Sequence, residues 1–181
     1  MKHIRSLVAV LVFYPLAAIC SGQSATAIAN PLIDYAGHRE TVKRVESLRE
    51  SRRLSEDDFL AKSREAGTVV LDARSGPMFA LLHLEGAVNL SFPDFTEESL
   101  AKVIPTKGTR VLIYCNNNFL GSPRSMPTKV FSTSLNISTY VALTSYGYTN
   151  VYELGPLLDV KKTVLSLAGT EAASHERKAV Q

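Results

Sequence analysis

Short apolar runs that alternate with helical segments are the feature that most constrains the fold of this chain. Thr68–Asp72, Arg110–Tyr114 and Val151–Leu154 are rich in Val, Ile, Leu and Tyr, and runs of this length and composition are typical of buried strands. A further run at Ala87–Leu90 predicts a short strand. Because helical segments separate these runs, the pattern predicts an α/β domain with a largely parallel sheet.

The helical segments carry recognisable start signals. Residues 34–53 place apolar side chains at roughly helical spacing, which predicts an amphipathic helix. Ser55, followed by three acids, is typical of an N-cap, and we expect its helix to end at Gly67. A short helix is expected from Pro77 to His83. Pro127 predicts the first turn of the final helix.

The amino terminus has the order of a secretory signal peptide. Lys2 and Arg5 precede the almost wholly apolar stretch from Leu7 to Ile19, and small residues follow it. The stretch is short for a membrane span, so we expect no stable membrane insertion after cleavage, which we place after Ala29. The mature protein is therefore expected to be exported, either to a periplasm or to the medium.

The chain has two cysteines, Cys20 and Cys115. Cys20 falls in the predicted signal peptide. Its flanks match a lipoprotein signal poorly, because Ile19 and Ala17 stand where such a signal has a small residue and a leucine. We therefore expect no lipid anchor and a mature protein with a single thiol. A lone cysteine in an exported protein is either buried and inert or kept for reactivity.

Composition and charge exclude several classes of function. The formal net charge of +3 comes without a dense basic stripe, so we expect no nucleic-acid partner. Two cysteines cannot form a four-cysteine zinc site, and His38 and His175 have no ligand spacing between them. We expect neither a metal nor a cofactor.

Cys115 has the position of a candidate nucleophile. It directly follows the run Arg110–Tyr114 and precedes a polar loop and then a helix. In open α/β sheets ligands bind at the carboxyl ends of strands, and the amides at a helix start favour an anion. A thiol there is expected to be partly ionised at neutral pH. The alternative is a buried cysteine that packs as a small hydrophobe, and the local pattern leaves both open.

Four motifs in a fixed order carry a resemblance that spans about Leu54 to Leu158. They are Val70–Arg74, His83–Asn89, Val111–Cys115 and Gly147–Leu154. In this combination the chain resembles the rhodanese-like domain family. The resemblance implies a central, largely parallel five-stranded sheet with helices on both faces. The chain then divides into a signal peptide (1–29), a helical lead-in (30–53), a rhodanese-like domain (54–165) and a flexible tail (166–181).

The resemblance also implies a chemistry. In active members of the family the strand-ending cysteine takes a sulfane sulfur from a donor such as thiosulfate, as a persulfide, and passes it to a thiol or to cyanide. Carried over, this implies an exported sulfurtransferase with Cys115 as its catalytic nucleophile, whose partners are a small sulfur-containing anion and a thiol acceptor, either a small molecule or a protein.

The resemblance assigns the remaining site residues to two groups. The anion would be bound by the loop after the cysteine, that is by Asn116, Asn117, Asn118, Phe119, Leu120, Gly121 and Arg124. Structural support would come from Asp72, Arg74, His83 and Gly86.

The loop after Cys115 departs from the family pattern. It is longer than usual and rich in Asn, and its only cation is Arg124, nine residues after the cysteine. This keeps a second hypothesis open, in which the domain is a catalytically silent binding or thiol-redox module. A related branch of phosphatases uses Cys-x5-Arg, and here Gly121 takes the place of that arginine, which disfavours phosphatase activity.

Overall fold

The computed structural model describes residue 28 and residues 30–172. The predicted signal peptide thus lies outside the described residues except for Ile28. The described residues fall into two units that divide between Ile33 and Asp34. In the described part of the first unit, Ile33 N donates to Asn30 O in a turn. Within the described part of the chain, no helix combines the length and the hydrophobicity needed to cross a bilayer.

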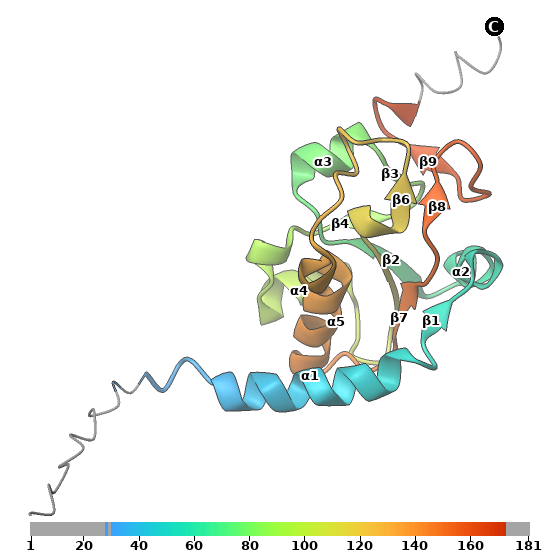
Figure 1. Ribbon diagram of the computed structural model, residues 1–181. Coiled ribbons are helices and arrows are strands. Elements are labelled where there is room, and N and C mark those ends of the chain that lie inside the picture. The colour runs from blue at the N-terminus through green and yellow to red at the C-terminus, as the bar shows by residue number, and fades with distance from the viewer. Residues whose placement is uncertain (1–27, 29, 173–181) are drawn as a thin grey trace, which may run out of the picture. The chain divides into compact units, whose positions relative to one another are not determined.

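A five-stranded parallel sheet forms the centre of the second unit (Figure 1). Its order is β1-β7-β5-β2-β4, and every pairing is parallel. The bounds are Arg53–Leu54 for β1, Val151–Leu154 for β7, Arg110–Tyr114 for β5, Thr68–Asp72 for β2 and Val88–Asn89 for β4. This confirms the predicted α/β fold with its five-stranded sheet.

The sheet separates two hydrophobic clusters because successive side chains of a strand point to opposite faces. In β5, Val111 and Ile113 belong to one cluster, and Leu112 and Tyr114 belong to the other. All four side chains are at most 1% exposed. The run is apolar throughout because both of its faces are buried.

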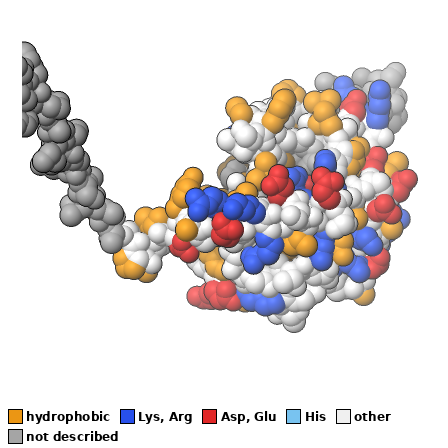
Figure 2. Space-filling view, turned by 60° about the horizontal axis from the view of Figure 1, so that its bottom comes forward, with side chains coloured by type: hydrophobic (Ala, Val, Ile, Leu, Met, Phe, Trp, Pro, Cys, Tyr) orange, Lys and Arg blue, Asp and Glu red, His pale blue; other side chains and the backbone are white. Residues whose placement is uncertain are grey.

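Helices cover both faces of the sheet, as predicted. The first cluster contains side chains from α1 (Tyr35–Arg49), α4 (Glu97–Val103) and α5 (Leu135–Ser145). The second contains Phe59 of α2 (Glu56–Ser63), and α3 (Gly76–Leu81) follows β2 along the chain. On the face shown in Figure 2, basic and acidic side chains are intermixed.

Most helix boundaries differ from the sequence prediction by a few residues. Ser55 caps α2 as expected, accepting from Asp58 N, but the helix ends at Ser63 rather than at Gly67. The helix expected from Pro77 to His83 is Gly76–Leu81.

The prediction that the final helix begins at Pro127 is wrong. The α-helix α5 begins at Leu135. Before it come the 3-10 helix η2 (Asn116–Asn118), the strand β6 (Phe119–Leu120), irregular chain and the 3-10 helix η3 (Phe131–Thr133). Side chains from η2 bind the main-chain oxygens of Pro127 and Lys129, which holds this stretch extended where a helix was expected.

Two small pairings lie outside the central sheet. Strand β6 pairs in parallel with β8 (Leu158–Asp159), and β3 (His83–Leu84) pairs antiparallel with β9 (Leu167–Ala168). We expected a flexible tail from residue 166, but β9 belongs to the folded domain. The helical lead-in is also part of the domain, because Val45 of α1 is 2% exposed and lies in the first cluster. Residues 173–181 of the expected tail lie outside the described residues.

Candidate functional site

The carboxyl ends of the central strands meet at one edge of the sheet, and Cys115 lies in the middle of that edge. It follows β5, whose neighbours are β2 on one side and β7 on the other. The side chain is 1% exposed, and its Sγ lies 3.4 Å from Oγ of Ser134. Ser134 is the residue that caps the amino end of α5. The structure therefore places the thiol at a helix start, although residues 116–134 separate the two in sequence.

The three asparagines after Cys115 bind the protein itself. Asn118 Oδ1 accepts from Cys115 N at 2.9 Å, and its Nδ2 donates to Leu154 O at 2.8 Å. The Asn116 amide donates to Pro127 O, and Asn117 exchanges two hydrogen bonds with the main chain of Lys129. Their side chains thus fix the path of residues 116–129 around the thiol.

The backbone amides that we expected to bind an anion are partly used within the loop. Asn118 N donates to Cys115 O at 3.0 Å, and Phe119 N donates to Asn116 O. Phe119 is 1% exposed and packs in the second cluster, whereas Leu120 of β6 pairs with Asp159 of β8.

The remaining two loop residues of the expected anion site have other surroundings. Gly121 has φ +89°, which favours glycine, and an added Cβ would come within 3.2 Å of Asp159 and Val160 side-chain atoms. Arg124 is exposed and pairs at 3.6 Å with Glu171. Of the residues assigned to anion binding, Asn118 therefore bonds directly to Cys115, whereas Arg124 has a partner in the C-terminal segment.

Asp72 and Arg74 form a buried ion pair at the end of β2. Arg74 Nη2 lies 2.5 Å from Asp72 Oδ2, and the two residues are 4% and 0% exposed. Arg74 also donates to the oxygens of Ser125 and Leu82, at 2.9 and 2.7 Å. The pair thereby joins the end of β2 to the loop that follows Cys115.

Tyr114 completes this network. Its hydroxyl donates to Asp72 Oδ2 at 2.5 Å and accepts from Leu84 N at 3.1 Å. Burial raises the pKa of Tyr114 well above its ordinary value, and the negative charge of Asp72 adds to the rise. Burial alone would lower the pKa of Arg74, but the hydrogen bonds and charge of Asp72 outweigh it, so that pKa is raised.

His83 and Gly86 have local contacts away from the thiol. His83 Nδ1 is 2.7 Å from Phe79 O, so it must carry the proton, and the ring stacks on Phe79 with centroids 3.7 Å apart. Gly86 has φ +79°, in the left-handed region that favours glycine.

Two cavities are lined by residues that neighbour or contact Cys115. The larger has a volume of about 410 Å³, and its lining includes Arg74, Asn116, Lys129 and Leu135. The smaller has a volume of about 150 Å³, and its lining includes Ser134, the residue that touches Sγ. Cys115 itself lines neither cavity, but the next residue, Asn116, lines the larger one and Ser134 lines the smaller one.

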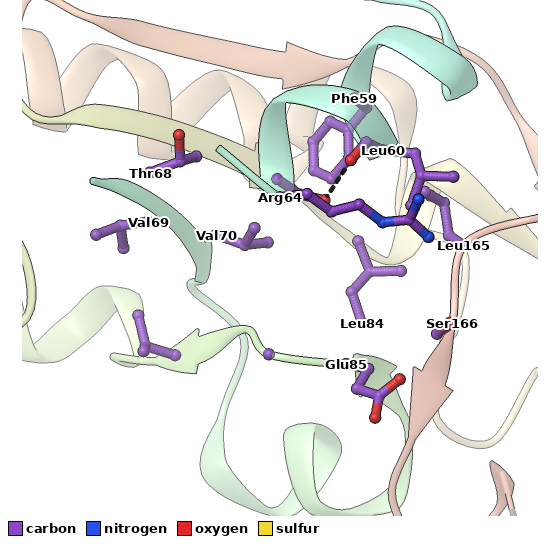
Figure 3. Close-up of a pocket in the computed structure, with 13 residues that line it drawn as sticks. Phe59, Leu60, Arg64, Thr68, Val69, Val70, Leu84, Glu85, Leu165 and Ser166 are labelled. Carbon is purple, nitrogen blue, oxygen red and sulfur yellow. Dashed lines mark hydrogen bonds between the residues drawn. The ribbon is translucent and has the colours of Figure 1, made fainter. Parts of the chain in front are cut away.

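A third cavity, of about 310 Å³, lies elsewhere on the molecule (Figure 3). It is bounded by the first residues of β2 (Thr68–Val70), by α2 and by Leu165. Figure 3 shows the Arg64 side chain extending toward Leu165. Cysteine and histidine are absent from its lining, and it lies near the amino end of β2, whereas Cys115 lies at the carboxyl edge. We therefore place the candidate site at the carboxyl edge.

Among the residues that the structure describes, no group of three or more His, Cys, Asp or Glu could hold a metal ion.

Two residues at the carboxyl edge of the sheet, Ser134 and Glu153, were not predicted from the sequence. Ser134 gave no signal, since its contact with Cys115 depends on the path of the loop. Glu153 did leave a signal in the sequence, because an acidic side chain inside the apolar run Val151–Leu154 needs a buried partner.

Comparison with known proteins gives one family match and several structural neighbours. The model of the rhodanese-like domain matches residues 55–155. No curated protein matches the chain. A rhodanese with anions from E. coli is 22% identical, with a TM-score of 0.39, and the match covers 56% of this chain and 98% of that one.

Two other solved structures are similar at lower identity. A thiosulfate sulfurtransferase from Pseudomonas aeruginosa is 16% identical with a TM-score of 0.46, and the match covers 79% of this chain and 27% of that one. A single-domain sulfurtransferase from Saccharomyces cerevisiae is 12% identical with a TM-score of 0.41, covering 62% and 88%.

Proposed function

Because the chain belongs to the rhodanese-like domain family, we propose that it is a sulfurtransferase in which Cys115 carries a sulfane sulfur as a persulfide. The observation that carries this proposal is the position of the thiol. Cys115 lies at the carboxyl edge of the sheet, with Sγ 3.4 Å from the residue that caps α5. The start of a helix favours an anionic sulfur, both as thiolate and as persulfide.

The first step loads the enzyme. The Cys115 thiolate attacks the outer sulfur of a thiosulfate-like donor, a new S–S bond forms, and the S–S bond of the donor breaks. Sulfite leaves with the electron pair. The larger cavity supports this step, since its lining includes the cation Lys129 and Asn116, the residue that follows Cys115.

The second step transfers the sulfur from the enzyme to an acceptor. The thiolate of an acceptor attacks the outer sulfur of the Cys115 persulfide, and the electron pair of the broken bond returns to Cys115 Sγ. Cyanide can replace the thiol as the acceptor. Neither step requires a net oxidant or reductant.

Mass spectrometry of the intact protein tests the proposal. After incubation with thiosulfate and removal of the excess, the full-length chain should gain the mass of one sulfur atom, and cyanide should remove it. The Cys115→Ser variant should gain nothing. The Cys20→Ser variant is the matched control and should load like the wild type. A wild-type protein that takes up no sulfur under these conditions would refute the proposal.

The burial of the thiol favours a second candidate function. Since Cys115 is 1% exposed and its loop is held by three asparagines, the domain could serve as a binding or thiol-redox module without turnover. That function requires a folded protein that neither loads sulfur nor transfers it to cyanide. The loading experiment therefore separates the two candidates.

We also propose that residues 1–29 direct export. The expected result is that expression of the full-length chain in a bacterial host yields a periplasmic or secreted protein whose amino terminus is Asn30. Recovery of the uncleaved chain from the cytoplasm alone would contradict this assignment. The readout is amino-terminal sequencing of each fraction.

A further inference from the structure

The smaller cavity beside Cys115 is built from polar side chains. Its volume is about 150 Å³, on the order of five water molecules. The side chains that matter for its chemistry come from α1, β1, β7 and the start of α5, and they are Arg49, Arg53, Ser134, Asn136 and Glu153.

Two buried acceptors in this lining have no hydrogen-bond partner among the described residues. Glu153 is 1% exposed, and its Oε1 receives Arg49 at 2.6 Å and Arg53 at 3.3 Å, while its Oε2 is unpaired. Asn136 is 6% exposed and donates through Nδ2 to Asn118 Oδ1 at 3.0 Å, while its Oδ1 is unpaired. Buried acceptors without a donor are costly and uncommon. An ammonium group, with three donors and a positive charge, has the donors that these two acceptors lack.

The two arginines supply the opposite charge. Arg49 and Arg53 have side chains that are 30% and 54% exposed, so they form the outer part of the lining. Arg49 uses Nε and Nη2 on Glu153, and Arg53 uses Nη2 on Gly155 O. The Nη1 group of each arginine can therefore donate to a carboxylate at the mouth of the cavity.

The cavity is close to the thiol, although Cys115 is not part of its lining. Ser134 lines it, and Ser134 Oγ lies 3.4 Å from Cys115 Sγ. A ligand held there thus lies one side chain away from the sulfur that would be transferred.

We propose that this cavity binds a small zwitterionic thiol, an α-amino acid with a thiol on a short side chain, as the sulfur acceptor. Its ammonium group lies against Glu153 and Asn136, its carboxylate against Arg49 and Arg53, and its thiol toward Cys115. The volume admits a three-carbon amino acid, whereas a tripeptide thiol has to leave most of its length outside. This inference rests on the proposed sulfurtransferase function.

The transfer step is balanced. The acceptor thiol loses its proton to solvent, and its thiolate attacks the outer sulfur of the Cys115 persulfide. One S–S bond forms on the acceptor and the S–S bond on Cys115 breaks, returning the electron pair to Cys115 Sγ. The product is the persulfide of the amino acid.

Single-turnover transfer to four thiols tests the assignment. Full-length protein loaded with thiosulfate is mixed with cysteine, N-acetylcysteine, cysteamine or 3-mercaptopropionate, and each rate is divided by the thiolate concentration. Cysteine should react about tenfold faster than each thiol that lacks one of its two charged groups, because each charged contact is worth about that factor. Equal normalised rates would overturn the inference and leave the proposed function standing.

Two variants locate the effect. In Arg53→Ala the ratio of the cysteine rate to the cysteamine rate should fall about tenfold, since the carboxylate loses one partner. Arg52→Ala is the matched control, because Arg52 bonds to Thr149 O and lies over the Tyr152 ring, and the ratio should stay at the wild-type value. A fall of the same size in Arg52→Ala would also overturn the inference.

A binding measurement separates failure of the inference from failure of the proposed function. Serine has the size and charges of cysteine without its thiol, so calorimetry should detect saturable binding of serine and none of N-acetylserine. If thiosulfate does not load Cys115, the proposed function fails and this measurement alone decides whether the cavity binds the zwitterion. Absence of serine binding would then overturn the assignment of the cavity.

Discussion

Replacing Asp72 with alanine should leave a positive charge buried without its counterion, next to the candidate site. In the wild type, Asp72 is 0% exposed and receives Arg74 through Nε and Nη2 at 2.5 to 3.1 Å. It also receives the Tyr114 hydroxyl at 2.5 Å. In Asp72→Ala the Arg74 guanidinium keeps only neutral partners, among them Leu82 O and Ser125 O.

The magnitude follows from the geometry. Breaking a buried ion pair by removing one partner costs about 3–5 kcal/mol, because the remaining charge stays out of water. Domains of ordinary size have an unfolding free energy of about 5–15 kcal/mol. The variant should therefore lose a large part of its stability, and its Tm should fall by about 10 °C or more. Urea unfolding followed by circular dichroism measures both the midpoint and the free energy of unfolding.

A double variant serves as the control for this reasoning. Asp72→Ala combined with Arg74→Met removes both charges, so no uncompensated charge remains buried, and it should be more stable than Asp72→Ala alone. The reasoning is refuted if Asp72→Ala unfolds within about 1 kcal/mol of the wild type. It is equally refuted if the double variant is no more stable than the single one.

Three further predictions concern other parts of the domain. Burial raises the pKa of Tyr114, so the stability that its protonated hydroxyl contributes is complete below about pH 10 and is lost as the pH rises further. In Tyr114→Phe the unfolding free energy should therefore fall less steeply at alkaline pH. Urea unfolding at several pH values between about 9 and 11 measures this. Asn118→Ala removes the acceptor of the Cys115 amide. It should lower the unfolding free energy by at least about 2 kcal/mol and speed alkylation of the thiol by iodoacetamide. An unchanged alkylation rate would contradict this. Gly169→Ala places a Cβ 2.6 Å from a main-chain oxygen, whereas Gly67→Ala meets nothing within 4 Å, so thermal melts should show the larger loss for Gly169→Ala although both have positive φ.

The central strands were predictable because their signals are local. The apolar runs Thr68–Asp72, Arg110–Tyr114 and Val151–Leu154 were predicted with the boundaries that the structure has. Each of these strands is buried on both faces, so consecutive residues along it have to be apolar. The place of Cys115 at the carboxyl edge followed from the same signal.

The loop after Cys115 was not predictable in the same way. Pro127 is a common first residue of a helix, but here its carbonyl accepts from the Asn116 side chain, eleven residues earlier in the chain. The contact of Ser134 with Cys115 likewise depends on how the intervening chain turns. Such bonds between side chains and distant main chain leave no periodic pattern. The sequence also does not show that one oxygen each of Asn136 and Glu153 lacks a hydrogen-bond partner, because this depends on how α5 and β7 pack in the fold.

The large sequence separation between β1 and its partner β7 predicts the order in which the strands of the sheet associate during folding. Arg53 pairs with Glu153, about 100 residues later in the chain, whereas β2 and β5 pair across about 40 residues. Closing the longer loop costs more entropy before any contact offsets it. We therefore expect β2 and β5 to associate early and β1 to join late. The polar cavity, which needs Arg53 and Glu153 together, is then completed last, and substitutions at Arg53 should speed unfolding far more than they slow refolding.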